Sequence, residues 1–437
     1  MRYCILNLTL TFTLLMTLAA SSQSAEIDSL TLDSAIALVV SNHPALQQAE
    51  HQIEASRAQV GSSRSSFYPQ ISGNGSYTRL GPVPTIDLPG AGSFSTVPKD
   101  NWNFYLGVNQ LVYDFGRRER GVDLAKSGIT TAKDSEGLIK SQLAYATIQV
   151  FYSILYLQQE IVVIDDQISD LTKLLDITKE KARTGTATDF DVLTTQVRVS
   201  AAETQKVDIE RQLRNQITTL KQLTGIPAEQ PLNTVGDFFT SVVSPSIDSL
   251  LDAALQQRPE MRLAEDAVTT ASLRHEVASL SRRPTVSVGV QVGFKNGYFP
   301  DLATLKGDFV AGASINMPIF TGYRVESQEQ LALADMNAAR AHTKDVERQI
   351  KSEVRRALED LRAGSDKIQN AEIQVRQAEQ ALKMAEVRYQ AGVITNLDLL
   401  DAQTSVSQAR LALIGAQYGY VVSKYALDQA TGAQIWE

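Results

Sequence analysis

The fold of this chain is decided by a stretch near its end, which reads Arg388-Tyr389-Gln390-Ala391-Gly392-Val393-Ile394-Thr395-Asn396-Leu397-Asp398-Leu399-Leu400-Asp401-Ala402-Gln403. A long helical pattern runs into this stretch, stops at Gly392 and restarts at Thr395. Glycine is the usual residue just past a helix C-terminus, and a threonine followed three residues later by an acid is typical of a capping box. The stretch therefore predicts the sharp tip of a helical hairpin.

The same tip occurs a second time, 207 residues earlier, as Arg183-Thr184-Gly185-Thr186-Ala187-Thr188-Asp189-Phe190-Asp191-Val192-Leu193. The similarity extends further, because residues 42–46 match residues 257–261 around a shared proline. Self-similarity over the whole length indicates a duplicated unit. The sequence predicts a first repeat over 26–230, a linker over 231–244 and a second repeat over 245–437.

The first 25 residues have the pattern of a secretory signal peptide. Arg2 precedes an apolar run over 5–18, and small and polar residues follow as far as Ala25. The only cysteine, Cys4, precedes the apolar run, so we expect neither a disulfide nor a lipid anchor after export. This combination indicates a Gram-negative periplasm or outer membrane. The net charge of −8 and the absence of a basic stripe argue against nucleic-acid binding.

Four segments alternate between apolar and polar residues, which indicates strands with one face of each kind. They span about 70–80, 102–113, 284–295 and 307–317. No later stretch approaches about 20 uninterrupted apolar residues, so the sequence predicts no membrane-spanning helix. Alternating strands are also the signature of a membrane β-barrel. A half-buried sheet of a soluble protein alternates in the same way, but no partner sheet or covering helix is available nearby in the sequence.

A very long helix follows each strand pair. Apolar residues recur at alternating steps of three and four from Leu143, as in a heptad seam. No proline interrupts 117–184 or 322–391, so each helix would be about 100 Å long. Past each tip glycine the chain returns as a shorter helix. The short helix pairs that open each repeat are therefore expected to pack against the remaining length.

Four strands cannot close a barrel, and an open sheet edge cannot face lipid. Three copies would supply twelve strands, which can close around an axis together with their helices. The predicted fold is mainly α with β: a homotrimeric 12-stranded transmembrane β-barrel, four strands from each copy, continued by a long periplasmic α-helical barrel.

The segment Val112-Tyr113-Asp114-Phe115-Gly116-Arg117-Arg118 and its counterpart Ile319-Phe320-Thr321-Gly322-Tyr323-Arg324 join strand to helix. With the duplicated strand pairs and both tips, they make the chain similar to the TolC family of trimeric outer-membrane ducts. The resemblance implies an exit duct of an efflux pump or type I secretion system. It also implies a periplasmic adaptor protein and an inner-membrane pump of the RND, ABC or MFS type as partners, in contact with outer-membrane lipid.

The resemblance implies a periplasmic gate at the tips. Asp398 and Asp401 match two aspartates that ring the entrance, where like charges would raise each other's pKa and attract cations. Capping alone also accounts for Asp398, whereas Asp401 has Thr194 as its repeat counterpart. Tyr389 and Asp191 match residues that hydrogen-bond between hairpins to keep the entrance closed. Tyr389 also completes a column of apolar residues that recurs every seven positions from Leu361, and this packing role is the other explanation of it.

One residue departs from the family pattern, because Ile394 stands where the family has a locking arginine. The resemblance also implies that an adaptor binds grooves at the tips, at Gly185, Gly392, Thr188 and Thr395. Simple helix termination is the other explanation of both glycines.

No pattern of a catalytic, metal or cofactor site is present in the sequence. The four histidines are dispersed and Cys4 lies in the signal peptide. The sequence therefore predicts a passive duct with no enzyme activity and no cofactor. The alternative function is a periplasmic coiled-coil scaffold or adaptor that does not enter the membrane. Drugs, metal ions and secreted proteins all remain possible cargo.

Overall fold

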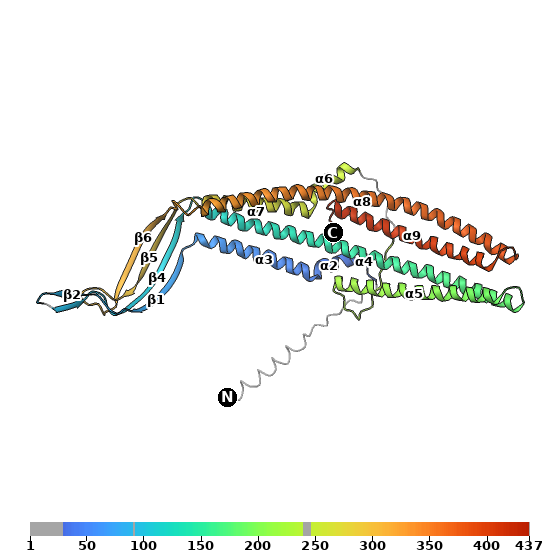
Figure 1. Cartoon of the computed structure of the whole chain (residues 1–437), viewed down its shortest axis with the longest axis horizontal. Coiled ribbons are helices and arrows are strands. Elements are labelled where there is room, and N and C mark those ends of the chain that lie inside the picture. Colours follow the sequence, from blue (N-terminus) through green and yellow to red (C-terminus); the bar gives the residue numbers. More distant parts are fainter. Residues whose placement is uncertain (1–28, 91, 239–245, 437) are drawn as a thin grey trace, which may run out of the picture.

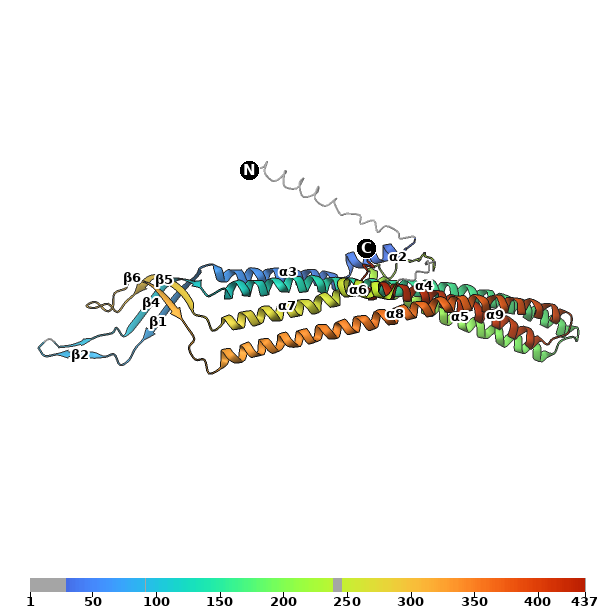
Figure 2. The ribbon, with the colours of Figure 1, turned by 90° about the horizontal axis from the view of Figure 1, so that it is seen from above.

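The computed structural model describes residues 29–90, 92–238 and 246–436 of the chain. The predicted signal peptide and part of the predicted linker lie outside the described residues. The molecule is elongated, with a β-sheet at one end and two helical hairpins at the other (Figure 1). The two hairpin tips lie side by side at the end remote from the sheet, as both views show (Figure 2).

Two helical hairpins form most of the helical part of the molecule. Helices α4 (Arg117–Arg183) and α8 (Arg324–Gln390) have 67 residues each, and α5 (Asp189–Thr224) and α9 (Asn396–Ala430) return beside them. At a rise of 1.5 Å per residue, each long helix is about 100 Å long.

Each long helix outreaches its returning partner, and the helix pair that opens its repeat covers the remainder. The pairs are α2 (Leu32–Asn42) with α3 (Pro44–Arg64), and α6 (Ile247–Gln257) with α7 (Pro259–Leu280). Helix α3 packs on α4, and α7 lies between α4 and α8. This confirms the packing expected from the unequal helix lengths.

The sheet contains strands from both repeats, in the order β1 (Gln70–Arg79), β4 (Asp100–Tyr113), β5 (Thr285–Lys295) and β6 (Lys306–Asn316). All neighbours are antiparallel, and the central β4–β5 pair joins the two repeats. Large apolar side chains on these strands are exposed, among them Phe104, Leu106 and Phe309. The sheet has no covering layer in the described part of the chain.

A further hairpin, not expected from the sequence, lies within the loop between β1 and β4. It consists of β2 (Thr85–Leu88) and β3 (Gly92–Ser95), paired antiparallel. Each strand is only four residues long, and prolines and glycines flank both. A segment this short carries too few alternations to be distinguished from a proline-rich loop.

Helix α4 is long and apolar enough to cross a membrane by length and composition alone, unlike the expectation from its sequence. Half of the residues in its most apolar stretch are buried inside the molecule. Ile148, Phe151 and Ile154 of α4 form an apolar core with residues of α2, α5 and α9. A helix in the core of a soluble protein can be equally long and apolar, so the composition of α4 is accounted for by its burial in this core.

Candidate functional site

The two hairpin tips are built alike, from the glycine outward. Gly185 and Gly392 have φ values of 76° and 71°, in the left-handed region that favours glycine. Beyond Gly392, the amide of Val393 donates to the carbonyl of Arg388 at 2.9 Å, and the amide of Gly392 donates to that of Tyr389 at 3.1 Å. The first tip has the same pair of bonds. These are Schellman motifs, which end α4 and α8 sharply.

Capping boxes start both returning helices, as the sequence predicts. The Asp398 carboxylate accepts hydrogen bonds from the backbone amide of Thr395 at 2.8 Å and from its hydroxyl at 2.7 Å. The Thr395 hydroxyl in turn accepts from the amide of Asp398. Thr188 and Asp191 make the same box at the start of α5.

These hydrogen bonds from Thr395 also lower the pKa of Asp398, because they favour its charged form. Within one copy the shift is therefore opposite to that expected for a ring of like charges.

Asp401 has no capping role. Its side chain is 64% exposed, and one oxygen lies 3.6 Å from the guanidinium of Arg198 on α5. This ion pair joins α9 of the second hairpin to α5 of the first. A cation therefore lies beside an acidic residue that was expected to face an entrance.

Tyr389 is buried in the apolar cluster that fills the tip end of the four long helices. Its ring lies beneath the ammonium of Lys181 on α4, with the nitrogen 3.8 Å from the ring centre. In the part of the chain that the structure describes, no hydrogen bond joins Tyr389 to Asp191. Ile394 packs against the same cluster, beside Leu399 and Leu400. The position of the family's arginine thus contributes apolar packing here.

Three residues that make contacts between the two hairpins, Asn396, Thr195 and Arg198, were not identified from the sequence. Asn396 donates from Nδ2 to the hydroxyl oxygen of Thr195 at 2.9 Å, and both side chains are buried. Arg198 is the third. The available signal was weak: Asn396 is a polar residue on the apolar face of α9, three and four residues before two buried leucines.

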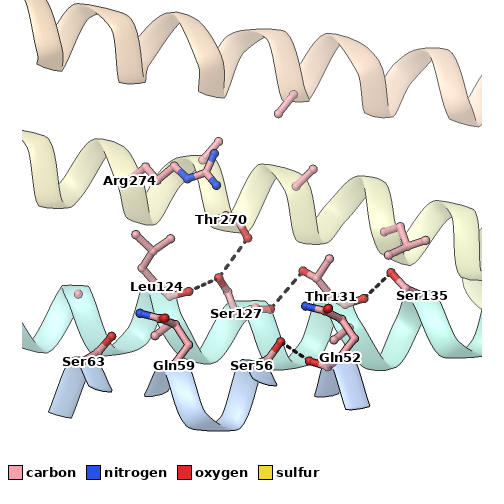
Figure 3. A pocket seen from close by; sticks show the side chains of 18 of the residues that line it. Gln52, Ser56, Gln59, Ser63, Leu124, Ser127, Thr131, Ser135, Thr270 and Arg274 are labelled. Atoms are coloured by element: carbon pink, nitrogen blue, oxygen red, sulfur yellow. Dashed lines mark hydrogen bonds between the residues drawn. The ribbon is translucent and has the colours of Figure 1, made fainter. Parts of the chain in front are cut away.

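A groove of about 780 Å³ lies far from the tips, between α3, α4, α7 and α8. Figure 3 shows its hydroxyl-rich lining, including Ser56, Ser127 and Thr131. Most of these hydroxyls donate to carbonyls of their own helix, and Ser127 also contacts Thr270 on α7 at 3.1 Å. Because most of the hydroxyl hydrogens are already donated within their own helices, few remain to bind a ligand. The small polar side chains are accounted for by close packing of the helices. Among the described residues, no group of three or more histidines, cysteines or acids is arranged to hold a metal ion.

Comparison with known proteins identifies the family. The model of the outer membrane efflux protein family matches residues 35–226 and 250–433, one segment within each predicted repeat. The chain belongs to this family. Membership in this TolC-like family places the chain in the outer membrane with a large periplasmic part, as an exit duct for tripartite efflux. The family is one of ducts and is not an enzyme family.

The relatives agree with this assignment. The chain is 23% identical over 407 residues to the probable efflux pump outer membrane protein TtgC of Pseudomonas putida, covering 91% of this chain and 81% of the relative. It is 23% identical to the outer membrane protein TolC of Escherichia coli, covering 90% and 80%. Solved structures share its fold. VceC of Vibrio cholerae matches with a TM-score of 0.78 at 20% identity, over 92% of this chain and 96% of that one. CusC matches with a TM-score of 0.79 at 17% identity, over 92% of both chains.

Proposed function

We propose that this family member works as a homotrimer, whose three sheets close into a 12-stranded membrane barrel and whose helices continue it as a periplasmic tube. One observation carries this proposal. The sheet and the helical part of one copy each have two open edges, and the edges of the two parts lie on the same two sides of the molecule. Strands β1 and β6 are the sheet edges. Helices α3 and α5 both pack on α4, and in Figure 1 they lie on the side of β1, whereas α8 lies on the side of β6.

The helical edges also carry apolar side chains that one copy leaves uncovered. On α5, Phe190, Leu193 and Val197 recur at steps of three and four and are between 61% and 75% exposed. On α8, Met384 and Val387 are similarly exposed. A seam of this spacing normally packs against another helix. Joining α5 of one copy to α8 of the next would cover both seams while β1 meets β6.

The trimer can be tested at the α5 seam. The full chain is expressed, extracted from outer membranes and sized by light scattering in detergent, where we expect the mass of three copies. Leu193→Asp places a charge in the seam and should shift the protein toward smaller species, whereas Leu193→Met should not. A protein found in the soluble periplasmic fraction would favour the alternative scaffold function.

We further propose that the tips form the periplasmic entrance. Three copies of Asp398 and Asp401 would place six carboxylates around one opening, which should bind cations. The double variant Asp398→Ala with Asp401→Ala is therefore expected to weaken block by divalent cations in planar bilayers. Asp208→Ala, at an exposed acid of α5 away from the tips, is the control. Unchanged block in the double variant would refute the role of these residues.

The tips are also the proposed docking site for a periplasmic adaptor, whose inner-membrane pump supplies the cargo. Gly185 and Gly392 leave open space, since a Cβ at either would meet no atom within 4 Å. The neighbouring Thr188 and Thr395 are exposed on the same surface. Thr186→Trp with Val393→Trp would fill this space and leave both glycines in place. We expect these changes to abolish efflux and adaptor co-purification while conductance stays unchanged; retained co-purification would refute the docking site.

A further inference from the structure

A polar contact lies inside the apolar cluster that joins the two hairpins of one copy. Asn396 is only 5% exposed and Thr195 is fully buried. Their neighbours in the cluster include Val199, Leu399 and Leu400. Two aliphatic side chains would fill this place with less desolvation, so apolar packing alone does not account for an amide and a hydroxyl here.

The contact has a defined direction. The Thr195 hydroxyl donates to the carbonyl of Asp191 at 2.8 Å, which leaves its lone pairs free for the amide of Asn396. The same amide nitrogen lies 3.4 Å from that carbonyl. The Thr195 hydroxyl, the Asp191 carbonyl and the Asn396 amide thus meet at the first turn of α5, next to its capping box. This arrangement ties the start of α9 to the start of α5.

The amide of Asn396 is only half satisfied. Its Oδ1 is buried and has no hydrogen-bond partner within the described residues. A buried polar atom without a partner raises the free energy of the packed state, and it regains its hydrogen bonds once water reaches it. The hydrogen bond from Asn396 to Thr195 therefore favours the packed hairpins, while the unpaired Oδ1 atom opposes packing. Separation of the hairpins would expose Oδ1 to water and remove this cost.

A second polar contact joins the same two helices one turn further along. Arg198 lies three residues beyond Thr195 on α5, and its guanidinium reaches Asp401 on α9. Both side chains are partly exposed, so solvent screens the pair and its contribution to stability is small. Its main effect is on the charge of the proposed entrance, because it places a cation beside the carboxylate of Asp401.

We propose that Asn396, Thr195 and Arg198 form a clasp between the two hairpins of each copy, which keeps the entrance closed and tunes its affinity for cations. Asn396 and Thr195 are the positioning residues, and Arg198 reduces the negative charge that Asp401 offers to an incoming ion. The clasp takes the place of the polar lock that Ile394 does not provide. It rests on the proposed function of the tips as the entrance.

The positioning pair is tested by the conductance of the purified full-length protein in planar bilayers. Thr195→Val keeps the shape of the side chain and removes the hydroxyl, and should raise the open-to-closed ratio by at least about threefold. Thr195→Ser keeps the hydroxyl and should behave as wild type. So should Thr404→Val, since Thr404 bonds only within its own helix. If Asn396→Ala is added to Thr195→Val, the effect should not increase in proportion, because both changes remove the same bond.

Arg198 is tested by divalent block in the same bilayers. Arg198→Gln should tighten block roughly two- to fivefold, the range of an exposed ion pair. Arg211→Gln is the matched control, since Arg211 pairs with Asp208 within α5. Wild-type conductance in Thr195→Val, or unchanged block in Arg198→Gln, would overturn the clasp. If the double aspartate variant still weakens block, the entrance stands without the clasp; if it also leaves block unchanged, the entrance itself is wrong.

Discussion

Gly293 provides the most direct test of the sheet that joins the two repeats. It lies on β5 opposite Tyr105 of β4, in the central strand pair. A Cβ at this position would lie 2.7 Å from the Tyr105 Cα, and closer still to the carbonyl oxygen of Phe104. These are backbone atoms, so no side-chain rotation can relieve the overlap. We predict that Gly293→Ala forces the two strands apart.

The size of the displacement sets the expected cost. Ordinary van der Waals contact begins at 3.4 Å, so the strands must separate by at least 0.7 Å at this point. A ladder hydrogen bond of about 2.9 Å would then lengthen to roughly 3.6 Å, beyond the usable range. Loss of two such bonds costs about 2–3 kcal/mol in water, and unsatisfied groups cost more where lipid replaces water.

The assay is the yield and thermal stability of assembled protein extracted from outer membranes. Gly312→Ala on β6 is the matched control, because a Cβ there meets no atom within 4 Å. We expect Gly293→Ala to reduce both yield and melting temperature, and Gly312→Ala to leave them unchanged. A Gly293→Ala protein that assembles like wild type would show that β4 and β5 do not pair in this register.

Three further predictions concern the helical part. Tyr389→Phe should keep wild-type conductance because the ring stays in place, whereas Tyr389→Ala should destabilise the tip cluster by about 3 kcal/mol and raise conductance; an opened Tyr389→Phe duct would instead assign the lock to the hydroxyl. Gly364→Leu should lower thermal stability by about 2–3 kcal/mol, because even a Cβ there lies 3.3 Å from the Tyr420 backbone on α9, and wild-type melting would contradict that close approach. Arg258→Met should cost roughly 1.5–3 kcal/mol in denaturant unfolding, because it removes the charged hydrogen bonds of a buried guanidinium to Glu260 and Glu353, whose carboxylates are themselves partly exposed. Arg348→Met, which breaks an exposed pair, should cost under about 1 kcal/mol, and equal losses would contradict this difference.

Local signals carried much of the fold, because helix ends are encoded within a few residues. Gly392 and Thr395 predict a helix stop and a capping box, and both are observed. Each of these signals occurs in both repeats, which made each prediction more specific. The β2–β3 hairpin was missed because its strands are too short to show a period.

The clasp was missed for a different reason. Asn396 and Thr195 are 201 residues apart in the chain, and each is adequately explained by its own helix. Helical periodicity shows that both face inward, but it does not show which inward residue meets which. That pairing depends on how the two hairpins are placed in space, which no local pattern contains.

The two tips have the same backbone but cannot make the same contacts, and this difference bears on how the entrance works. The repeat counterparts of Asn396 and Thr195 are Asp189 and Ala402, so the polar contact forms once in each copy and not twice. Asp189 is exposed, whereas Asn396 is buried. Helix α5 therefore uses two faces, one turned toward α9 within the copy and one bearing the exposed apolar seam. If that seam binds the next copy, as proposed, the clasp can open while the trimer remains intact, because separate side chains of α5 hold the two interfaces.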